Sequence, residues 1–197
     1  MKLYWSPRTR AFRIAWLLEE FARPYERIAI DINDEAARAD PAFRAASPMG
    51  KVPALDDGAA KLWDSGAICI YMADAYPEAG LGVAISDPAR AAFLQWAMFT
   101  NAVIEPAIGE KASGRPVNTR QSGHGSFDLM IETLVAGLTP GPWILGQRFT
   151  APDVLIGSSV HFLAAFDLLP ERQELRAYLE RCQARPAFER AMAMDAA

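Results

Sequence analysis

The sequence predicts an α+β N-terminal domain with the element order βαβ-ββα, followed by an all-α C-terminal domain. Short apolar runs and helical periodicity alternate through residues 2–76, whereas residues 88–194 hold only helical patterns. Between them, a stretch of small residues and proline begins after Pro77. The predicted ranges are 1–77 for the first domain, 78–87 for the linker and 88–197 for the second domain.

The first half of the N-terminal domain alternates strand and helix patterns. Residues 2–5 predict a short strand, and after the turn "SPRT" apolar side chains recur at helical spacing from Ala11 to Phe21. Arg27–Ile32 predicts a second strand. The alanine-rich residues 34–44 predict a second helix, which completes a βαβα order.

The segment "SPMGKVPAL" leads into the second half of this domain. Val52–Asp56 and Ala60–Trp63 are short apolar runs on either side of Asp57-Gly58, which is a hairpin signal. Pro53 has no N–H, so it fits the first position of a strand or argues against a central strand. Ser65–Tyr76 predicts the helix that closes the domain.

The C-terminal domain begins with a long amphipathic helix pattern. Asp87 suits the N-cap and Pro88 the first helical position, and the pattern runs to Gly109. Pro106 should kink or end this helix, because proline removes a backbone hydrogen bond. Phe127–Leu138 predicts the next helix.

The core of the C-terminal domain is predicted from a helix that is apolar on every side. Thr150 and Asp153 have the spacing of a capping box with aspartate in place of glutamate. The following residues, Val154–Phe166, are nearly all apolar, which is typical of a fully buried helix. Patterns around 175–182 and 186–194 predict the last two helices.

Composition narrows the function classes. The chain has 197 residues, 51% of them hydrophobic, and a net charge of −4, which suits a folded protein and argues against a nucleic-acid surface. No apolar run approaches the length of a membrane span and no signal-peptide pattern opens the chain, so we expect no membrane partner and a cytoplasmic location. Cys69 and Cys182 lie far apart in helical patterns, so we expect buried thiols and no metal site.

Five segments spread over nearly the whole chain resemble the cytosolic glutathione transferases. They are "LYWSPRTRAFRIAWLLEE", "SPMGKVPAL", "LWDSGAICIYMAD", "WILGQRFTAPDV" and "RPAFERAM", in the order and spacing of that family. The resemblance implies a thioredoxin-like N-terminal domain that binds glutathione as a co-substrate. It also implies a two-fold homodimer, in which the third helix and the hairpin of one subunit meet the long helices of the other.

The resemblance assigns the "GKVP" segment to glutathione. The family's equivalent of Pro53 is cis, and the backbone of Val52 would then pair with the cysteinyl part of the tripeptide. Lys51 would reach the glycyl carboxylate as a point charge. From the residues alone, a solvated loop lysine at position 51 and an ordinary trans turn proline at position 53 are the favoured interpretation, and the resemblance reverses that preference.

The segment "WDSG" would hold the γ-glutamyl end of glutathione. Ser65 stands at a helix start, where N–H groups attract a carboxylate, and Asp64 would pair with the ammonium group. Either residue also fits a plain helix N-cap, and a cap can do both jobs.

The resemblance further implies that a hydroxyl in the turn "SPRTR" stabilises the glutathione thiolate. Thr9 matches the position of the serine in serine-type members, and Arg10 and Arg13 would raise the local potential. Ser6 is the alternative, and it takes the role if the Thr9 hydroxyl points at backbone instead. Tyr4 ranks third, because it lies within the strand and should face the core or a sheet edge.

A small hydrophobic electrophile would bind between this turn and the long helix of the second domain. Residues 96, 99, 100 and 103 share a helix face, which is equally compatible with plain core. Two departures, Gly50 in place of a histidine and Gly66 in place of an arginine, favour the alternative of a non-catalytic binding protein. The turn holds no cysteine, which argues against a cysteine-type mechanism. The candidate pocket residues are Trp5, Trp96, Phe99, Thr100 and Val103.

Overall fold

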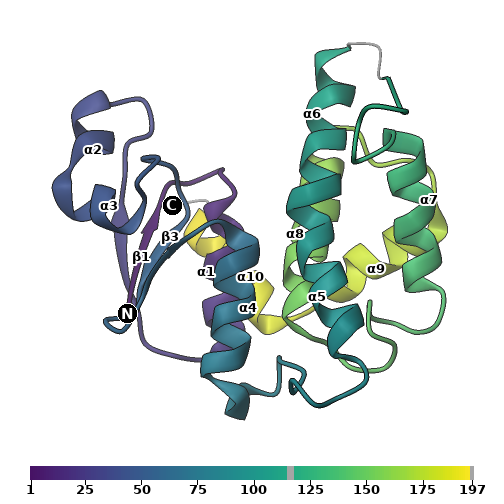
Figure 1. Ribbon diagram of the computed structural model, residues 1–197, viewed down its shortest axis with the longest axis horizontal. Helices are drawn as coiled ribbons and strands as arrows, with labels where there is room; N and C mark the ends of the chain where they lie inside the picture. The colour runs from purple at the N-terminus through teal and green to yellow at the C-terminus, as the bar shows by residue number, and fades with distance from the viewer. Residues whose placement is uncertain (115–117, 196–197) are drawn as a thin grey trace. The chain divides into compact units, whose positions relative to one another are not determined.

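The computed structural model describes residues 1–114 and 118–195 and divides the chain into two compact units (Figure 1). The sheet unit comprises residues 1–79 together with the segment that begins at Gln183, and the helical unit comprises residues 80–182. No described helix is long and apolar enough to cross a membrane.

The sheet unit contains a four-stranded mixed sheet in the order β2-β1-β3-β4. β1 pairs in parallel with β2, and β3 pairs antiparallel with both β1 and β4. The predicted hairpin is therefore present, whereas β2 ends before the predicted Ile32 because its partner β1 turns away at Ser6. The strand bounds are Lys2–Trp5 for β1, Glu26–Ala29 for β2, Ala54–Asp56 for β3 and Lys61–Trp63 for β4.

Helices cover both faces of this sheet (Figure 1). Leu3 and Leu55 are paired in register and fully buried. Tyr4 alternates with Leu3 and so faces the opposite side, where its ring lies 5.4 Å from that of Phe43. Tyr4 thus faces the core, as one of the two predicted alternatives had it. The helices of this unit are α1 (Ala11–Phe21), α2 (Glu35–Ala39), α3 (Pro41–Ala46), α4 (Ser65–Ala75), a 3-10 turn (Pro77–Ala79) and α10 (Pro186–Asp195).

The predicted single helix over residues 34–44 is wrong, because two short helices replace it. Asp40 adopts φ −49° and ψ 128°, outside the helical region, as a residue before proline tends to do. Its carboxylate accepts a hydrogen bond from the Phe43 N–H at 2.8 Å and so caps α3. The chain therefore changes direction at Asp40-Pro41 and sends Phe43 into the core.

The last helix, α10, packs on α1 within the sheet unit. The Phe188 ring meets the rings of Phe12 and Trp16 edge-on, at 5.2 and 4.9 Å between centroids. Arg185 makes a bidentate ion pair with Glu20, at 2.5 and 2.7 Å. The segment from Gln183 onward therefore belongs to the sheet unit, because Phe188 covers the apolar face of α1. The sequence analysis had placed this segment in the second-domain range of 88–197.

The helical unit opens with a helix that continues past its proline. α5 (Arg90–Phe99) is followed by a π-helical turn, Thr100–Ile104, and then by α6 (Glu105–Ser113). The interruption expected near Pro106 is therefore present as a π-helical turn between α5 and α6, and the α-helix resumes at Glu105. Pro106 falls in the first turn of α6, directly after the wider π turn, where its missing N–H costs least.

The remaining helices surround α8, which carries the predicted capping box. Thr150 and Asp153 bond reciprocally at its start, and its residues are mostly buried as far as Leu163. Phe166, at the end of the predicted core helix, is 54% exposed, so the buried stretch is one turn shorter than expected. The bounds are Phe127–Leu138 for α7, Ala151–Ala165 for α8 and Gln173–Gln183 for α9.

Candidate functional site

The turn between β1 and α1 holds both predicted hydroxyls. The Thr9 hydroxyl donates to the Ser6 carbonyl at 2.7 Å and accepts from the Ala11 N–H at 3.2 Å. Arg8, between them, has φ 55°, a left-handed conformation that is unusual for a residue with a side chain. In the structure the Thr9 hydroxyl therefore points at backbone and caps the turn. This is the arrangement for which Ser6 was the predicted alternative as the hydroxyl that stabilises the thiolate.

Ser6 offers a different kind of hydroxyl. Its residue is 6% exposed, and within the described ranges its hydroxyl makes no hydrogen bond with the protein. It can donate its proton without breaking an existing bond.

The loop before β3 has the geometry that the resemblance implied. The Val52–Pro53 peptide bond is cis. Ser47, which the sequence analysis did not single out, fixes the loop from inside: its hydroxyl donates to the Lys51 carbonyl at 2.8 Å and accepts from the Lys51 N–H at 3.0 Å. A fully buried serine four residues upstream thus holds the backbone on which Lys51 stands.

The backbone conformation of this loop explains why residue 50 is a glycine. Its φ is +62°, and a Cβ there would lie 2.6 Å from Nη1 of Arg44 and 3.1 Å from the Arg38 carbonyl oxygen. A larger residue at this position would require Arg44 to move and the backbone to strain.

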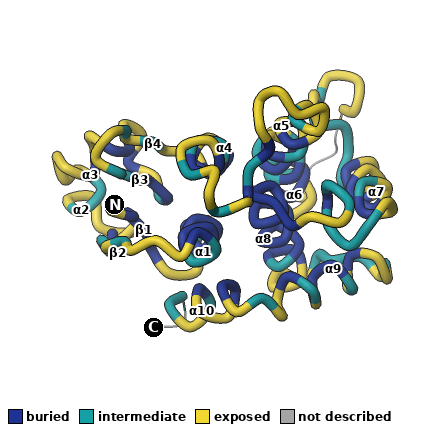
Figure 2. Tube along the Cα trace, turned by 90° about the horizontal axis from the view of Figure 1, so that it is seen from below, coloured by how far each residue is buried: buried dark blue, intermediate teal, exposed yellow. Residues whose placement is uncertain are grey.

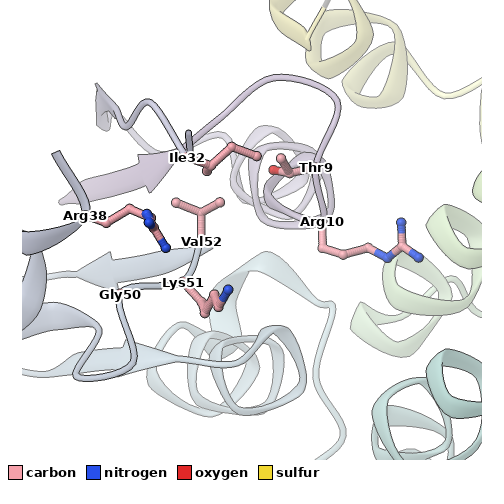
Figure 3. Close-up of a pocket in the computed structure, with 7 residues that line it drawn as sticks. All are labelled: Thr9, Arg10, Ile32, Arg38, Gly50, Lys51 and Val52. Carbon is pink, nitrogen blue, oxygen red and sulfur yellow. The ribbon is translucent and has the colours of Figure 1, made fainter. Parts of the chain in front are cut away.

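The turn between β1 and α1 and the loop before β3 meet at a cavity of about 340 Å³ (Figure 3). It brings together Thr9, Lys51 and Val52 from the predicted set, whereas Ser6, Pro53, Asp64 and Ser65 are not among the residues lining it. The complete lining is Thr9, Arg10, Ile32, Arg38, Gly50, Lys51 and Val52.

The lining of this cavity is strongly basic. Arg10, Arg38 and Lys51 contribute to it, and none of the seven lining residues is acidic. In Figure 3 the Arg10 side chain points away from Lys51 and Val52, although Arg10 also lines the cavity. Nε of Arg38 is buried and has no hydrogen-bond partner within the described chain. Sequence reasoning missed Arg38, because an arginine in an alanine-rich helix gives no signal of its surroundings.

The start of α4 holds the other predicted pair. The Asp64 carboxylate accepts from the N–H groups of Gly66 and Ala67, at 2.9 and 3.4 Å, so Asp64 is the N-cap. Ser65 is 5% exposed, and its hydroxyl accepts from Nη1 of the buried Arg13 at 3.4 Å. Because a guanidinium only donates, the Ser65 hydroxyl oxygen is the acceptor in this contact. Arg13 therefore lies against the start of α4 and contacts Ser65.

The predicted electrophile residues fall in both units. In the sheet unit, Trp5 is 8% exposed, and the Arg27 guanidinium lies 5.0 Å from its ring centroid. In the helical unit, Trp96 rests on Gly137 of α7, where an added Cβ would come within 2.3 Å of the indole. The Trp96 and Phe99 rings meet at 5.1 Å, and Thr100 is fully buried. Trp96 and Phe99 thus pack within the helical unit, and the pocket role of the whole set, Val103 included, stays a prediction.

The cysteines do not contribute to this site. Cys69 and Cys182 are buried, as expected, and form no disulfide. Within the described residues, no three His, Cys, Asp or Glu side chains are grouped so that they could hold a metal ion.

Comparison with known proteins gives one match to a family model. Residues 1–74 match the model described as Glutathione S-transferase, N-terminal domain. Among curated proteins, Glutathione S-transferase GstA of Escherichia coli O157:H7 is 23% identical over 199 residues, covering 99% of this chain and 98% of that protein. Disulfide-bond oxidoreductase YfcG of Escherichia coli K12 is 26% identical over 165 residues, covering 77% of this chain and 75% of that protein.

Solved structures extend the likeness to the whole fold. A glutathione transferase from Methylococcus capsulatus has a TM-score of 0.84 and 26% identity, covering 99% of this chain and 98% of that one. A sphingomonad glutathione S-transferase complexed with glutathione has a TM-score of 0.77 and 24% identity, with 100% and 99% coverage. With its thioredoxin-like sheet, its cis-proline loop and its helical second half, the chain has the fold of the glutathione S-transferases, and residues 1–74 match the N-terminal domain of that family.

Proposed function

We propose that this protein binds glutathione in the basic cavity and activates its thiol as a thiolate. The thiolate sulfur then bonds to carbon of a small hydrophobic electrophile as a leaving group departs or a double bond opens. Alternatively, two glutathione molecules reduce a peroxide to an alcohol and water and become the disulfide. The observation that carries the proposal is the cavity itself, which combines the Thr9 turn with the Lys51-Val52 loop. The complex of a similar transferase with glutathione supports the choice of ligand.

The cavity accounts for the glycyl end of glutathione. Lys51 supplies a cation for the glycyl carboxylate, and Arg38 adds a guanidinium whose Nε lacks a protein partner. The backbone of Val52 pairs with the cysteinyl residue. Asp64 and Ser65, at the start of α4, take the γ-glutamyl ammonium and carboxylate.

Thr9 is the proposed activating group. It is preferred to Ser6 despite its bond to backbone, because Thr9 lines the cavity and Ser6 does not, and on binding its proton turns from the Ser6 carbonyl to the thiolate. A hydrogen bond to a charged group contributes about 1.5–3 kcal/mol against about 1 kcal/mol for a neutral one, so the exchange is favourable. Ser6 is the second candidate, because its hydroxyl has no bond to give up.

The electrophile and the assembly complete the proposal. Trp5, Trp96, Phe99, Thr100 and Val103 remain the candidate residues for contact with the electrophile, and the protein acts as a cytoplasmic homodimer. A non-catalytic glutathione-binding protein is the alternative. The structure weakens one of its two supports, because Gly50 is explained by its positive φ and by Arg44.

The test measures binding and turnover separately. Titration calorimetry with glutathione should show binding, and assays with a chromogenic electrophile, an organic peroxide and a small disulfide should identify the reaction. The disulfide is included because one relative is named a disulfide-bond oxidoreductase. Glutathione binding without turnover of any of the three substrates would favour the non-catalytic alternative. Folded protein that neither binds glutathione nor reacts would contradict both the transferase and the non-catalytic binding protein.

A matched pair of variants tests whether glutathione binds in this cavity. Lys51→Met should weaken glutathione binding by about tenfold or more, because it removes a charged hydrogen bond. Lys2→Met makes the same change in charge on an exposed residue of β1 and should leave binding unchanged. Equal effects of the two would place glutathione elsewhere.

A further inference from the structure

The end of α10 contacts the turn that holds Ser6 and Thr9. Oδ1 of Asp195 accepts a hydrogen bond from the Arg8 backbone N–H at 3.0 Å, across nearly the whole length of the chain. Arg8 is the left-handed residue of that turn, with φ 55°. A residue with a Cβ keeps this conformation where its surroundings hold it, and Asp195 supplies a hydrogen bond from outside the turn.

α10 is well placed to deliver this carboxylate. Arg190 pairs with Glu19 of α1 at 2.6 Å. One residue before Asp195, the Met194 sulfur accepts a hydrogen bond from the Tyr25 hydroxyl at 3.4 Å. Asp195 therefore stands at the end of a helix fixed along its length, and it is not a residue of a loose tail.

The geometry of Arg8 sets the direction of both hydroxyls. The bond from the Thr9 hydroxyl to the Ser6 carbonyl closes around Arg8, so a change of φ at Arg8 would move Ser6 and Thr9 relative to each other. We propose that Asp195 is a positioning residue that holds this turn in the conformation in which its hydroxyls can reach a bound thiolate. This inference rests on the proposed function.

Charge and hydrogen bonding at Asp195 act on the thiol in opposite directions. The negative charge alone disfavours a nearby thiolate and raises the pKa of the thiol, whereas the hydrogen bond positions the hydroxyls that lower this pKa. Asp195→Asn keeps an acceptor oxygen and removes the charge. Asp195→Ala removes both, so the two variants separate the effects.

The experiment has one readout without ligand and one with it. Amide hydrogen exchange at Arg8 should accelerate in Asp195→Ala and stay near wild type in Asp195→Asn. With glutathione bound, thiolate absorbance against pH should give a higher thiol pKa in the Ala variant than in the Asn variant, by about threefold to tenfold in the ionisation constant. Glu189→Ala, an exposed carboxylate on the same helix, is the matched control and should change neither readout.

The outcomes separate this inference from the proposed function. Unchanged exchange at Arg8 in Asp195→Ala, or identical thiol titrations in the Ala and Asn variants, would overturn the positioning role in a protein that still binds glutathione. Wild-type protein that binds no glutathione would overturn the proposed function, and with it the effect of Asp195 on the thiol. Thermal unfolding of each variant ensures that the compared proteins are folded.

Discussion

The Thr9 hydroxyl has a single proton, and that proton already serves the Ser6 carbonyl. Turning it to a thiolate exchanges a neutral hydrogen bond for a charged one, a net gain of about 1 kcal/mol. That gain corresponds to somewhat less than one pKa unit of the thiol. An unbonded hydroxyl such as that of Ser6 would contribute the full charged bond, so the size of the shift identifies the donor.

We predict that Thr9→Ala raises the pKa of bound glutathione by about half to one unit, because the redirected hydrogen bond is lost. Thr9→Ser keeps the hydroxyl and should stay close to wild type. Thiolate absorbance as a function of pH measures each value. A shift of one to two units in Ser6→Ala, with none in Thr9→Ala, would assign the thiol to Ser6.

The place of some site residues can be predicted from the sequence, and the place of others cannot. Lys51 and Val52 stand beside a proline in a recognisable segment, so their place at the cavity could be predicted. Arg38 and Ser47 could not, because they reach the site only through the break at Asp40-Pro41 and through a bond inside the loop. Their roles depend on tertiary contacts that no local pattern encodes.

At the scale of elements, the start of α8 is a buried network around one carboxylate. Asp153 accepts from the N–H groups of Ile144 and Thr150, both at 2.8 Å, and from the Tyr178 hydroxyl at 3.0 Å. Burial nevertheless raises the pKa of Asp153 to about 6. The folded state therefore binds a proton here more tightly than the unfolded chain does.

This raised pKa predicts a loss of stability with rising pH. The contribution of Asp153 is fully present below about pH 4, the ordinary value, and is lost as pH rises through about 6, the folded value. Chemical denaturation at pH 4.5, 5.5 and 7 should give a steeper fall in unfolding free energy for wild type than for Asp153→Asn, which cannot ionise. Parallel pH profiles would contradict the assignment. Asp153→Asn should also be less stable at low pH, because its NH₂ group faces N–H donors.

Elements with a complete local signal were predicted within a residue or two, and the others were not. The capping box fixed the start of α8, and the Asp57-Gly58 turn fixed the hairpin. The break between α2 and α3 was not predicted, because the high alanine content of residues 34–44 favours one continuous helix despite the Asp40-Pro41 pair. The π-helical turn before Pro106 has no sequence signature, since it is an adjustment of a helix to its packing.

For the whole molecule, exposed apolar side chains support the proposed dimer. Trp63 on the edge strand β4 is 44% exposed, and Leu94 and Met98 lie one turn apart on α5 at 37% and 49%. They belong to the hairpin and the long helix, the elements that the family resemblance pairs across a two-fold axis.

We predict a dimeric mass by light scattering at micromolar concentration. Trp63→Lys should raise the dissociation constant by at least about tenfold, because it places a charge where an aromatic anchor was. Ile85→Lys changes an 85% exposed residue outside these elements and serves as the control. A wild-type monomer, or equal weakening by both variants, would contradict the arrangement.

The chain leaves the sheet unit after Ala79 and returns to it at Gln183, so the whole helical unit is an insertion within a discontinuous one. Figure 2 shows buried residues on α1 and α10, and Phe188 of α10 covers Phe12 and Trp16. Once residues 1–79 have emerged from the ribosome their strands can pair, but the rings of Phe12 and Trp16 still lack their cover. Completion of the first unit therefore waits for the last helix to emerge, and a nascent chain that stalls within the helical unit presents an apolar face to chaperones.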